Sequence, residues 1–256
     1  MLSKSKTKFI HSLENKKKRD QLGLFVAEGS KVVGDLLETM PAELILATSE
    51  WISGRQGLDR LSGETIEVDG DELRKASFMQ APQQVLAVFK KKQQNGTPSL
   101  QGKLSLALDG VQDPGNVGTI IRIADWFGIE TIYCSHETAD VYNPKVVQST
   151  MGSLARVDVV YTDLCKLADN APEGFPIYGT LLDGENIYGK QLKDEGLIVM
   201  GNEGKGISPE MRKRINQKLY IPNFPITRKT ADSLNVATAT AVVCSEFRRS
   251  KQISML

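Results

Sequence analysis

The chain has 256 residues, with 32 Lys and Arg residues against 31 Asp and Glu residues and a formal net charge of +1. This balance excludes a protein that binds nucleic acid through overall charge, so any RNA site must be a local basic patch. The 40% hydrophobic and 25% charged residues are typical of a globular protein, and the length allows one large or two modest domains.

Metal and membrane sites are also disfavoured. Cys134, Cys165 and Cys244 are far apart, lack CxxC spacing and lie in or beside apolar or helical runs, which predicts buried reduced thiols. Since only His11 and His136 are available as imidazoles, we expect no metal site. No apolar run approaches the roughly 18 residues that span a bilayer, so we expect no membrane insertion and a cytoplasmic location.

Residues 3–23 predict a basic helix with Phe9, Ile10 and Leu13 on one apolar face. Its polar side includes four consecutive cations, Lys16, Lys17, Lys18 and Arg19. Such a run either stays solvated or contacts phosphates, and the residues alone favour solvation.

A compact α/β domain is predicted to follow. A short apolar run ends at Glu28 and precedes a helix, and further strands are predicted at 43–48, 65–68 and 84–89, with a helix or turn at 69–76. Residues 90–103 have the polar, glycine- and proline-containing composition of a linker. We therefore divide the chain into an N-terminal domain (1–92), a linker (93–103) and a second domain (104–256).

The second domain begins with a predicted strand at 104–109. Asp113 and Pro114 suit the N-cap and first position of a helix that runs to Phe127. Asn116 lies in its first turn. Arg122 lies further along, on a face shared with Asp125, so the residues alone suggest a surface ion pair between these two.

Residues 197–235 predict strand, glycine loop, helix, strand and helix. Carboxyl ends of parallel strands are where α/β proteins bind ligands, and Gly201 would let backbone approach one. The loop sequence GNEGKG fits neither the dinucleotide nor the phosphate-loop pattern, so it does not identify the ligand alone. The helix predicted at 232–249 is apolar nearly all round and must be covered on several sides, by the core or by a second copy.

Three stretches share a resemblance: GVQDPGNVGTIIRIADWFGI, VMGNEGKGIS, and YIPN followed by SLNVATATAVV. In order and spacing, they resemble the three motifs of the SpoU, or TrmH-like, RNA ribose 2′-O-methyltransferases of the SPOUT superfamily, over residues 104 to about 249. The resemblance implies an α/β-knot domain with a trefoil-knotted, mainly parallel sheet, S-adenosylmethionine as cofactor, and a homodimer. The N-terminal domain resembles an L30e-like RNA substrate-binding domain.

The resemblance also assigns residues to roles. The catalytic group would be Arg122, Asn116, Glu203, Ser233 and Asn235. The cofactor would be held by Thr180, Gly201, Ile221 and Leu234. The stretch FVAEGSKVV is similar to a family sequence. With this resemblance, we favour RNA binding over solvation for the neighbouring cations Lys16, Lys17, Lys18 and Arg19.

The predicted catalytic residues are expected to have different chemical roles. Because a guanidinium is a poor base, we expect Arg122 to stabilise developing alkoxide charge or to hold the adjacent phosphate. Glu203 either orients Arg122 or accepts a proton, or only caps its own loop. We expect Asn116 to contact substrate and Asn235 to order a loop.

The loop at 223–232 is longer than the corresponding family turn and carries Arg228 and Lys229, which either reach RNA or decorate the surface. The predicted function is 2′-O-methylation of RNA, with ribosomal RNA favoured over transfer RNA. The alternative from another class is a non-catalytic RNA-binding ribosome assembly factor.

Overall fold

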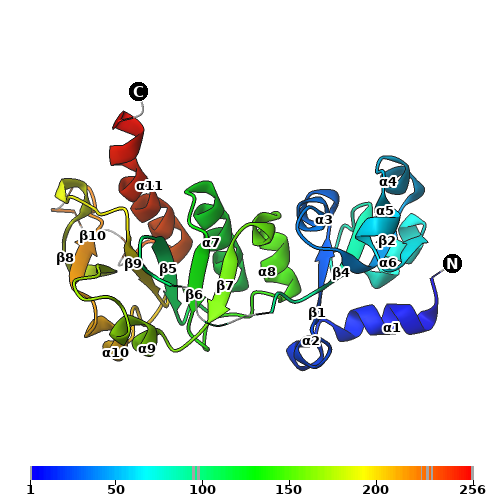
Figure 1. Ribbon diagram of the computed structural model, residues 1–256, viewed down its shortest axis with the longest axis horizontal. Coiled ribbons are helices and arrows are strands. Elements are labelled where there is room, and N and C mark those ends of the chain that lie inside the picture. The colour runs from blue at the N-terminus through cyan, green and yellow to red at the C-terminus, as the bar shows by residue number, and fades with distance from the viewer. Residues whose placement is uncertain are drawn as a thin grey trace. The chain divides into compact units, whose positions relative to one another are not determined.

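The computed structural model describes residues 2–93, 96, 99–225, 227–228, 231 and 233–254, with no account of side chains after Arg249. The chain forms two compact units (Figure 1). The first consists of Met1–Gln93 and Asp140–Ala155, and the second of Gln94–Ala139 and Arg156–Leu256. Residues 140–155, which the sequence placed with the second domain, thus group by contacts with the first unit.

The first unit contains a four-stranded mixed sheet in the order β1-β4-β2-β3. Strand β4 pairs antiparallel with both β1 and β2, and β2 pairs parallel with β3. The strands are β1 (Leu24–Glu28), β2 (Ala42–Ala47), β3 (Thr65–Glu67) and β4 (Val85–Lys90). The helices are α1 (Lys4–Ser12), α2 (Lys16–Leu22), α3 (Ser30–Leu37), α4 (Ser49–Ser53), α5 (Leu58–Leu61), α6 (Gly70–Ala76) and α8 (Pro144–Ser149), followed by the short 3-10 helix η1 (Ser153–Ala155).

Local capping explains where these helices begin. Asp69 forms a capping box with Glu72 at the start of α6. The predicted single N-terminal helix is instead two helices, because the Asn15 side chain accepts a hydrogen bond from the Lys17 N–H and starts α2 there. Helices α4 and α5 were not predicted, since each is a single short turn without a periodic apolar pattern.

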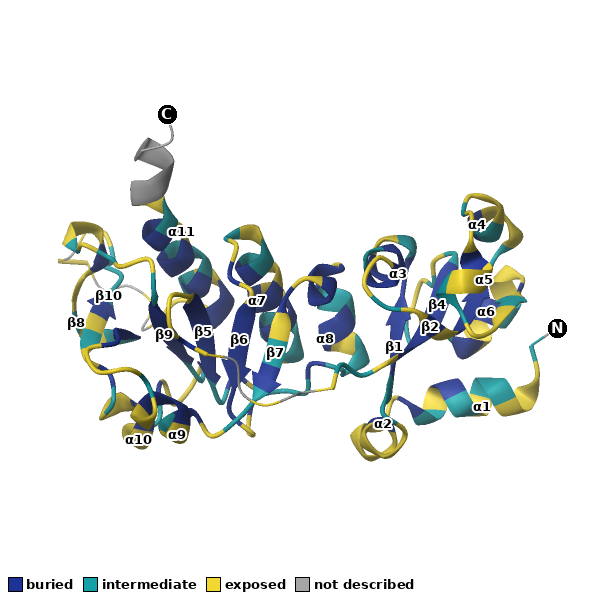
Figure 2. Cartoon of the chain, viewed as in Figure 1, coloured by how far each residue is buried: buried dark blue, intermediate teal, exposed yellow. Residues whose placement is uncertain are grey.

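The second unit contains a six-stranded sheet in the order β10-β8-β9-β5-β6-β7, and every pairing in it is parallel. The strands are β5 (Leu104–Asp109), β6 (Thr131–Cys134), β7 (Asp158–Tyr161), β8 (Ile177–Asn186), β9 (Gly196–Gly201) and β10 (Gln217–Tyr220). The central strands β5 and β9 are buried over almost their whole length, as expected for a parallel sheet with helices on both faces (Figure 2).

Helices cover the sheet of the second unit. They are α7 (Pro114–Trp126), α9 (Leu164–Asp169), α10 (Pro209–Arg212) and α11 (Val236–Ser254), with η2 (Ile187–Gly189) between β8 and β9. Helices α7 and α11 lie side by side (Figure 1) and pack on β6 and β9 respectively. Leu164 of α9 and Met211 of α10 belong to the apolar cluster that includes Ala107 and Val199 of the central strands.

Several predicted boundaries differ from the structure. Strand β8 continues past Thr180 to Asn186, because β10 pairs with it in two separate segments. The basic helix predicted after the glycine loop is only the four residues of α10. Helix α9 was not predicted. The α/β fold class is confirmed, whereas the trefoil knot stays a prediction.

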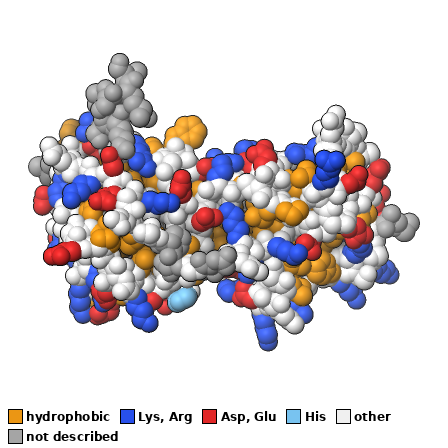
Figure 3. All heavy atoms as spheres, in the orientation of Figure 1, with side chains coloured by type: hydrophobic (Ala, Val, Ile, Leu, Met, Phe, Trp, Pro, Cys, Tyr) orange, Lys and Arg blue, Asp and Glu red, His pale blue; other side chains and the backbone are white. Residues whose placement is uncertain are grey.

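The surface charges are mixed, and two of the three cysteines are buried. On the face shown in Figure 3, Lys and Arg side chains are interspersed with Asp and Glu. Cys134 and Cys244 are buried thiols, and burial raises the pKa of Cys244 to about 12, while Cys165 is half-buried. Among the described residues no helix could span a membrane, and no group of His, Cys, Asp and Glu side chains is arranged to hold a metal ion.

Candidate active site

Two adjacent strand ends carry the candidate site in the second unit. Asp109 at the end of β5 pairs in register with Gly201 at the end of β9. The chain leaves β5 into α7, whose N-cap is Asp113, and leaves β9 into the glycine loop. Because parallel strands end on the same edge of the sheet, both loops emerge together.

The glycine loop is closed on itself by Asn202. The Asn202 backbone exchanges hydrogen bonds with Gly206 at 3.0 and 2.9 Å, and its Oδ1 accepts from the N–H groups of Gly204 and Lys205 at 2.9 and 3.0 Å. Its Nδ2 donates to the Gly110 carbonyl at 2.8 Å, which ties the loop to the end of β5. The loop is therefore rigidly placed beside the start of α7.

The absence of a side chain at Gly201 has a cause within the chain. A Cβ there would lie 2.3 Å from both the Gly206 carbonyl carbon and the Ile207 nitrogen, closer than any non-bonded contact allows. The sequence interpretation was that this glycine lets backbone approach a ligand. That role stays a prediction, and the structure shows that the missing side chain also lets the loop fold back on β9.

Side chains from the three motif stretches meet in one chain of hydrogen bonds. Asn235 Nδ2 donates to Asn116 Oδ1 at 2.9 Å, and Asn116 Nδ2 donates to Glu203 Oε1 at 2.8 Å. These residues are separated by 119 and 87 positions in the sequence. The predicted convergence of Asn116, Glu203 and Asn235 is thus present within a single chain.

The direction of this hydrogen-bond chain is fixed at both ends. Asn235 caps α11, because its Oδ1 accepts from the N–H groups of Ala237 and Thr238 at 2.9 and 3.2 Å. Its Nδ2 must therefore face Asn116, which in turn can only donate towards the carboxylate of Glu203. One oxygen of Glu203 is held in this way, and the residue itself is exposed.

Arg122 does not join this group within the chain. Its side chain is exposed on α7 and has no hydrogen-bond or ion-pair partner in the described part of the structure. The surface ion pair that the residues alone suggested is wrong, because Asp125 instead accepts from Arg156 Nε at 3.0 Å and Nη2 at 2.8 Å. Arg122 is thus free to act on a group outside its own chain.

The predicted cofactor residues come from four separate places: Gly201 ends β9, Thr180 lies within β8, Ile221 follows β10 and Leu234 precedes α11. Thr180 stands where β8 parts from β9, with its Oγ1 3.8 Å from Met200 Sδ. Ile221 follows β10 directly and is half-buried. Leu234 is 53% exposed and, with exposed Ser233, immediately precedes the α11 cap.

The long loop before Ser233 is partly ordered by Asn223. Its Oδ1 accepts from the Tyr220 hydroxyl at 3.1 Å, and its Nδ2 donates to the Arg228 carbonyl at 3.3 Å. Arg228 is exposed, and Phe224 is 91% exposed. Lys229 and Asp232 lie outside the described residues.

The predicted RNA-binding run in the first unit divides into two kinds of residue. Lys16, Lys17 and Lys18 are exposed on α2. Arg19 is 1% exposed and makes an ion pair of 2.6 Å with Asp140, while its Nη1 donates to the carbonyls of Leu13 and Glu14. The prediction that Arg19 binds RNA is wrong, because its guanidinium is committed inside the protein.

Sequence inspection missed two residues that place the site. Asn202 was treated only as part of a glycine-rich pattern, although Asn commonly bonds backbone two residues on, which is a recognisable signal. Asp109 accepts from the Ser208 N–H at 2.7 Å and fixes the start of α10. Nothing local in the sequence marks that second contact.

Residues 103–245, more than half of the chain, match the SpoU rRNA Methylase family model. The chain belongs to the SpoU rRNA methylase family. Its motif residues Asn116, Glu203 and Asn235 all fall within that match. Residues 4–87 match an MRM3-like substrate binding domain.

The chain is also similar to proteins of stated activity. The chain is 29% identical to the Bacillus subtilis 23S rRNA (guanosine(2553)-2′-O)-methyltransferase RlmP, over 95% of this chain and 96% of that protein. It is 32% identical to the Neisseria meningitidis 23S rRNA (guanosine-2′-O-)-methyltransferase RlmB, over 58% of this chain and 59% of that one.

Solved structures of RNA methyltransferases have a similar fold. A putative RNA methyltransferase of the TrmH family from Porphyromonas gingivalis has a TM-score of 0.87 and 38% identity, covering 98% of this chain and 99% of that one. An AdoMet-bound rRNA methyltransferase from Sinorhizobium meliloti has a TM-score of 0.83 and 29% identity, covering 98% and 96%.

Proposed function

We propose that this chain is an enzyme that transfers the methyl group of S-adenosylmethionine to a ribose 2′-hydroxyl of ribosomal RNA. The observation that carries the proposal is the hydrogen-bond chain from Asn235 through Asn116 to Glu203, which joins all three motifs of the family at one edge of the sheet. Relatives named as 23S rRNA 2′-O-methyltransferases support ribosomal RNA as the substrate class.

The residues around the strand ends suit the proposed cofactor. Bound there, S-adenosylmethionine supplies an electrophilic methyl group on a sulfonium. The half-buried Ile221 and the exposed Leu234 offer apolar contact beside polar backbone at the ends of β9 and β10. In this proposal, a bound adenosine covers Leu234 beside the helix cap.

The hydrogen-bonded group positions the acceptor. Asn116 and Asn235 hold the Glu203 carboxylate in one orientation, and its second oxygen remains available to a ribose hydroxyl or to a guanidinium. Holding reacting groups in line lowers the barrier by up to roughly 7–11 kcal/mol in favourable models. Ser233, exposed beside this group, supplies a further hydroxyl.

Arg122 stabilises negative charge on the substrate and does not act as a base. Its guanidinium stabilises the developing alkoxide or holds the neighbouring phosphate. The test is the pH dependence of single-turnover methylation by Arg122→Lys. A large loss of rate with an unchanged pH profile supports this role, whereas a retained rate with a lowered apparent pKa indicates proton abstraction.

The active enzyme is a homodimer in which α7 and α11 meet a second copy. Trp126 at the end of α7 is 85% exposed, and the nearby Arg122 has no partner among the described residues of its own chain. A second copy would cover Trp126 and bring Arg122 to the other chain's Glu203. Sedimentation at micromolar concentration should give the dimer mass, and a monomer contradicts this arrangement.

The first unit binds the RNA, with Lys16, Lys17 and Lys18 towards phosphate. The proposed compartment is the cytoplasm, where ribosomal RNA is assembled. The decisive assay combines calorimetric titration with S-adenosylmethionine and mass spectrometry of nucleosides from treated ribosomal and transfer RNA. We expect cofactor binding and one 2′-O-methylnucleoside in ribosomal RNA. Methylation of transfer RNA alone would contradict the proposal that ribosomal RNA is the substrate. Absence of cofactor binding would favour the assembly-factor alternative.

A further inference from the structure

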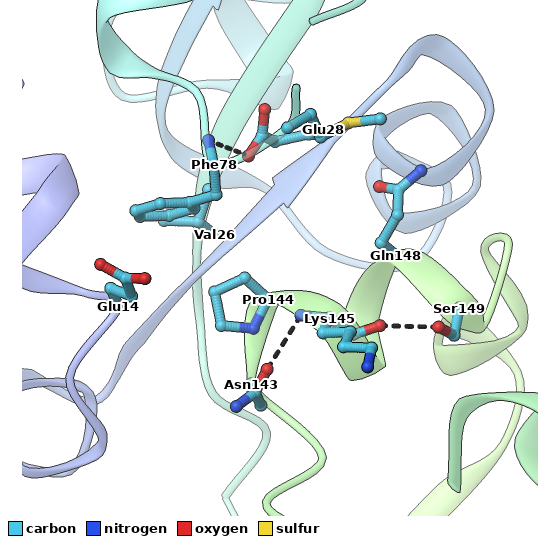
Figure 4. Close-up of a pocket in the computed structure, with 10 residues that line it drawn as sticks. Glu14, Val26, Glu28, Phe78, Asn143, Pro144, Lys145, Gln148 and Ser149 are labelled. Carbon is cyan, nitrogen blue, oxygen red and sulfur yellow. Dashed lines mark hydrogen bonds between the residues drawn. The ribbon is translucent and has the colours of Figure 1, made fainter. Parts of the chain in front are cut away.

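A cavity of about 410 Å³ lies within the first unit, and none of the motif residues lines it (Figure 4). It falls in the range of roughly 300–1,000 Å³ typical of small-ligand pockets. Its lining comes from the turn between α1 and α2, from β1, from the segment after α6, and from α8. Pro144 and Gln148 on α8 lie across from Val26, Glu28 and Phe78.

Buried charged groups hold the walls of this cavity in place. Arg19 bonds the Leu13 and Glu14 carbonyls on one wall and Asp140, which leads into α8, on another. Glu28 accepts from the Phe78 N–H at 2.9 Å and from the Ser77 hydroxyl, which fixes the third wall. Each of these walls is therefore held by a buried side chain whose hydrogen bonds are satisfied.

The lining combines flat apolar surface with uncommitted polar groups. Phe78 and Pro144 provide ring surfaces and Val26 is a buried floor. In the part of the chain that the structure describes, the side chains of Gln148 and Lys145 have no hydrogen-bond or ion-pair partner. The Glu14 side chain, also in the lining, is likewise without a partner among the described residues.

We propose that this cavity binds one unpaired nucleobase of the RNA substrate. RNA is read mainly through unstacked bases that lie on aromatic or apolar faces and are hydrogen-bonded at their edges. Phe78 and Pro144 supply the faces, and the Gln148 amide supplies both a donor and an acceptor. Lys145 is placed for the attached phosphate. The inference rests on the proposed function for its choice of RNA as the ligand.

The position of the cationic run fits this assignment. Glu14 lines the cavity, and the exposed Lys16, Lys17 and Lys18 follow it within four residues. An RNA strand held by these lysines would therefore pass the cavity mouth. Phosphate contacts would fix the strand, and the cavity would select a position where a base is free to leave its stack.

The experiment measures binding of ribosomal RNA from the source organism, without cofactor, at several salt concentrations. Gln148→Leu keeps the side-chain size and removes the hydrogen bonds, and we expect affinity about tenfold weaker, in line with the loss of hydrogen bonds to one base. The salt dependence should be unchanged, because no phosphate contact is removed. Lys17→Ala should instead reduce the salt dependence, and Gln101→Leu, an exposed glutamine of the other unit, should change neither.

Ultraviolet cross-linking gives a second, direct measurement. A base stacked on Phe78 should cross-link to a peptide that contains residues 78–79, and Phe78→Leu should remove that product. Wild-type affinity in Gln148→Leu, or cross-links only to peptides outside the lining, overturns the inference. Because neither measurement contains S-adenosylmethionine, a protein that binds RNA here but transfers no methyl group would overturn the proposed activity and keep this site.

Discussion

Asn116 donates a 2.8 Å hydrogen bond from its Nδ2 to Oε1 of Glu203, across 87 positions of sequence. The bond joins the first turn of α7 to the tip of the loop that follows β9. Its direction is set by Asn235, whose own oxygen is occupied by the start of α11. Two segments of the chain therefore orient the carboxylate that a third segment carries.

Subunit mixing tests whether Arg122 acts across a dimer interface. Arg122→Ala and Glu203→Ala proteins should each be nearly inactive. If each site takes Arg122 from one copy and Glu203 from the other, a mixed dimer keeps one intact site. Random exchange should then restore about a quarter of wild-type activity. If both residues act within one chain, mixing restores nothing.

Gly201→Ala tests the closure of the glycine loop. The added Cβ would overlap backbone of Gly206 and Ile207 at 2.3 Å, so the loop must shift. We expect a loss of about 1–3 kcal/mol of stability and a large loss of methylation. Gly204→Ala is the matched control, because the nearest atom to its Cβ is 3.7 Å away. Equal melting temperatures for the two variants would rule out the overlap as the reason for the glycine.

The first unit allows a sharp comparison between two neighbouring cations. Arg19→Ala removes one partner of a buried ion pair and should cost about 3–5 kcal/mol of unfolding free energy. Lys17→Ala changes an exposed side chain and should leave stability within about 0.5 kcal/mol while weakening RNA binding. Urea unfolding and filter binding measure both effects. A stable Arg19→Ala protein with weakened RNA binding would restore the original interpretation of the run.

Glu28 should make stability fall as pH rises. Burial raises the pKa of its carboxyl above the ordinary value of 4.5, and hydrogen bonds from Ser77 and Phe78 offset part of the rise. The folded state therefore holds the proton longer than the unfolded state, so its stabilising contribution is full below pH 4.5 and is lost as pH rises through the raised pKa. Urea unfolding from about pH 4 to about pH 7 should show wild type losing stability relative to Glu28→Gln. A constant difference would show that this carboxyl has an unshifted pKa.

The sequence predicted what depends on local pattern. Apolar runs identified β5 and β9, and Asp113 was correctly expected to cap its helix. These features need only periodicity and capping chemistry.

What the sequence could not predict depends on distant partners. The four cations at 16–19 look alike, yet Arg19 turns inward because Asp140 lies beside it, 121 positions away. The return of Gly206 and Ile207 onto Gly201 also has no local signal in the sequence. The grouping of residues 140–155 with the first unit, and with it the cavity beside α8, has no local signal at all.

The central claim is that the three motifs act as one hydrogen-bonded unit in methyl transfer. A double-mutant cycle on single-turnover methylation tests it most directly, with Asn116→Ala, Glu203→Ala and the double variant. We expect each single change to slow the reaction by about 100-fold, and the double variant to be no slower than the slower single one. Losses that multiply to about 10,000-fold would show that the two residues act independently and would contradict the claim.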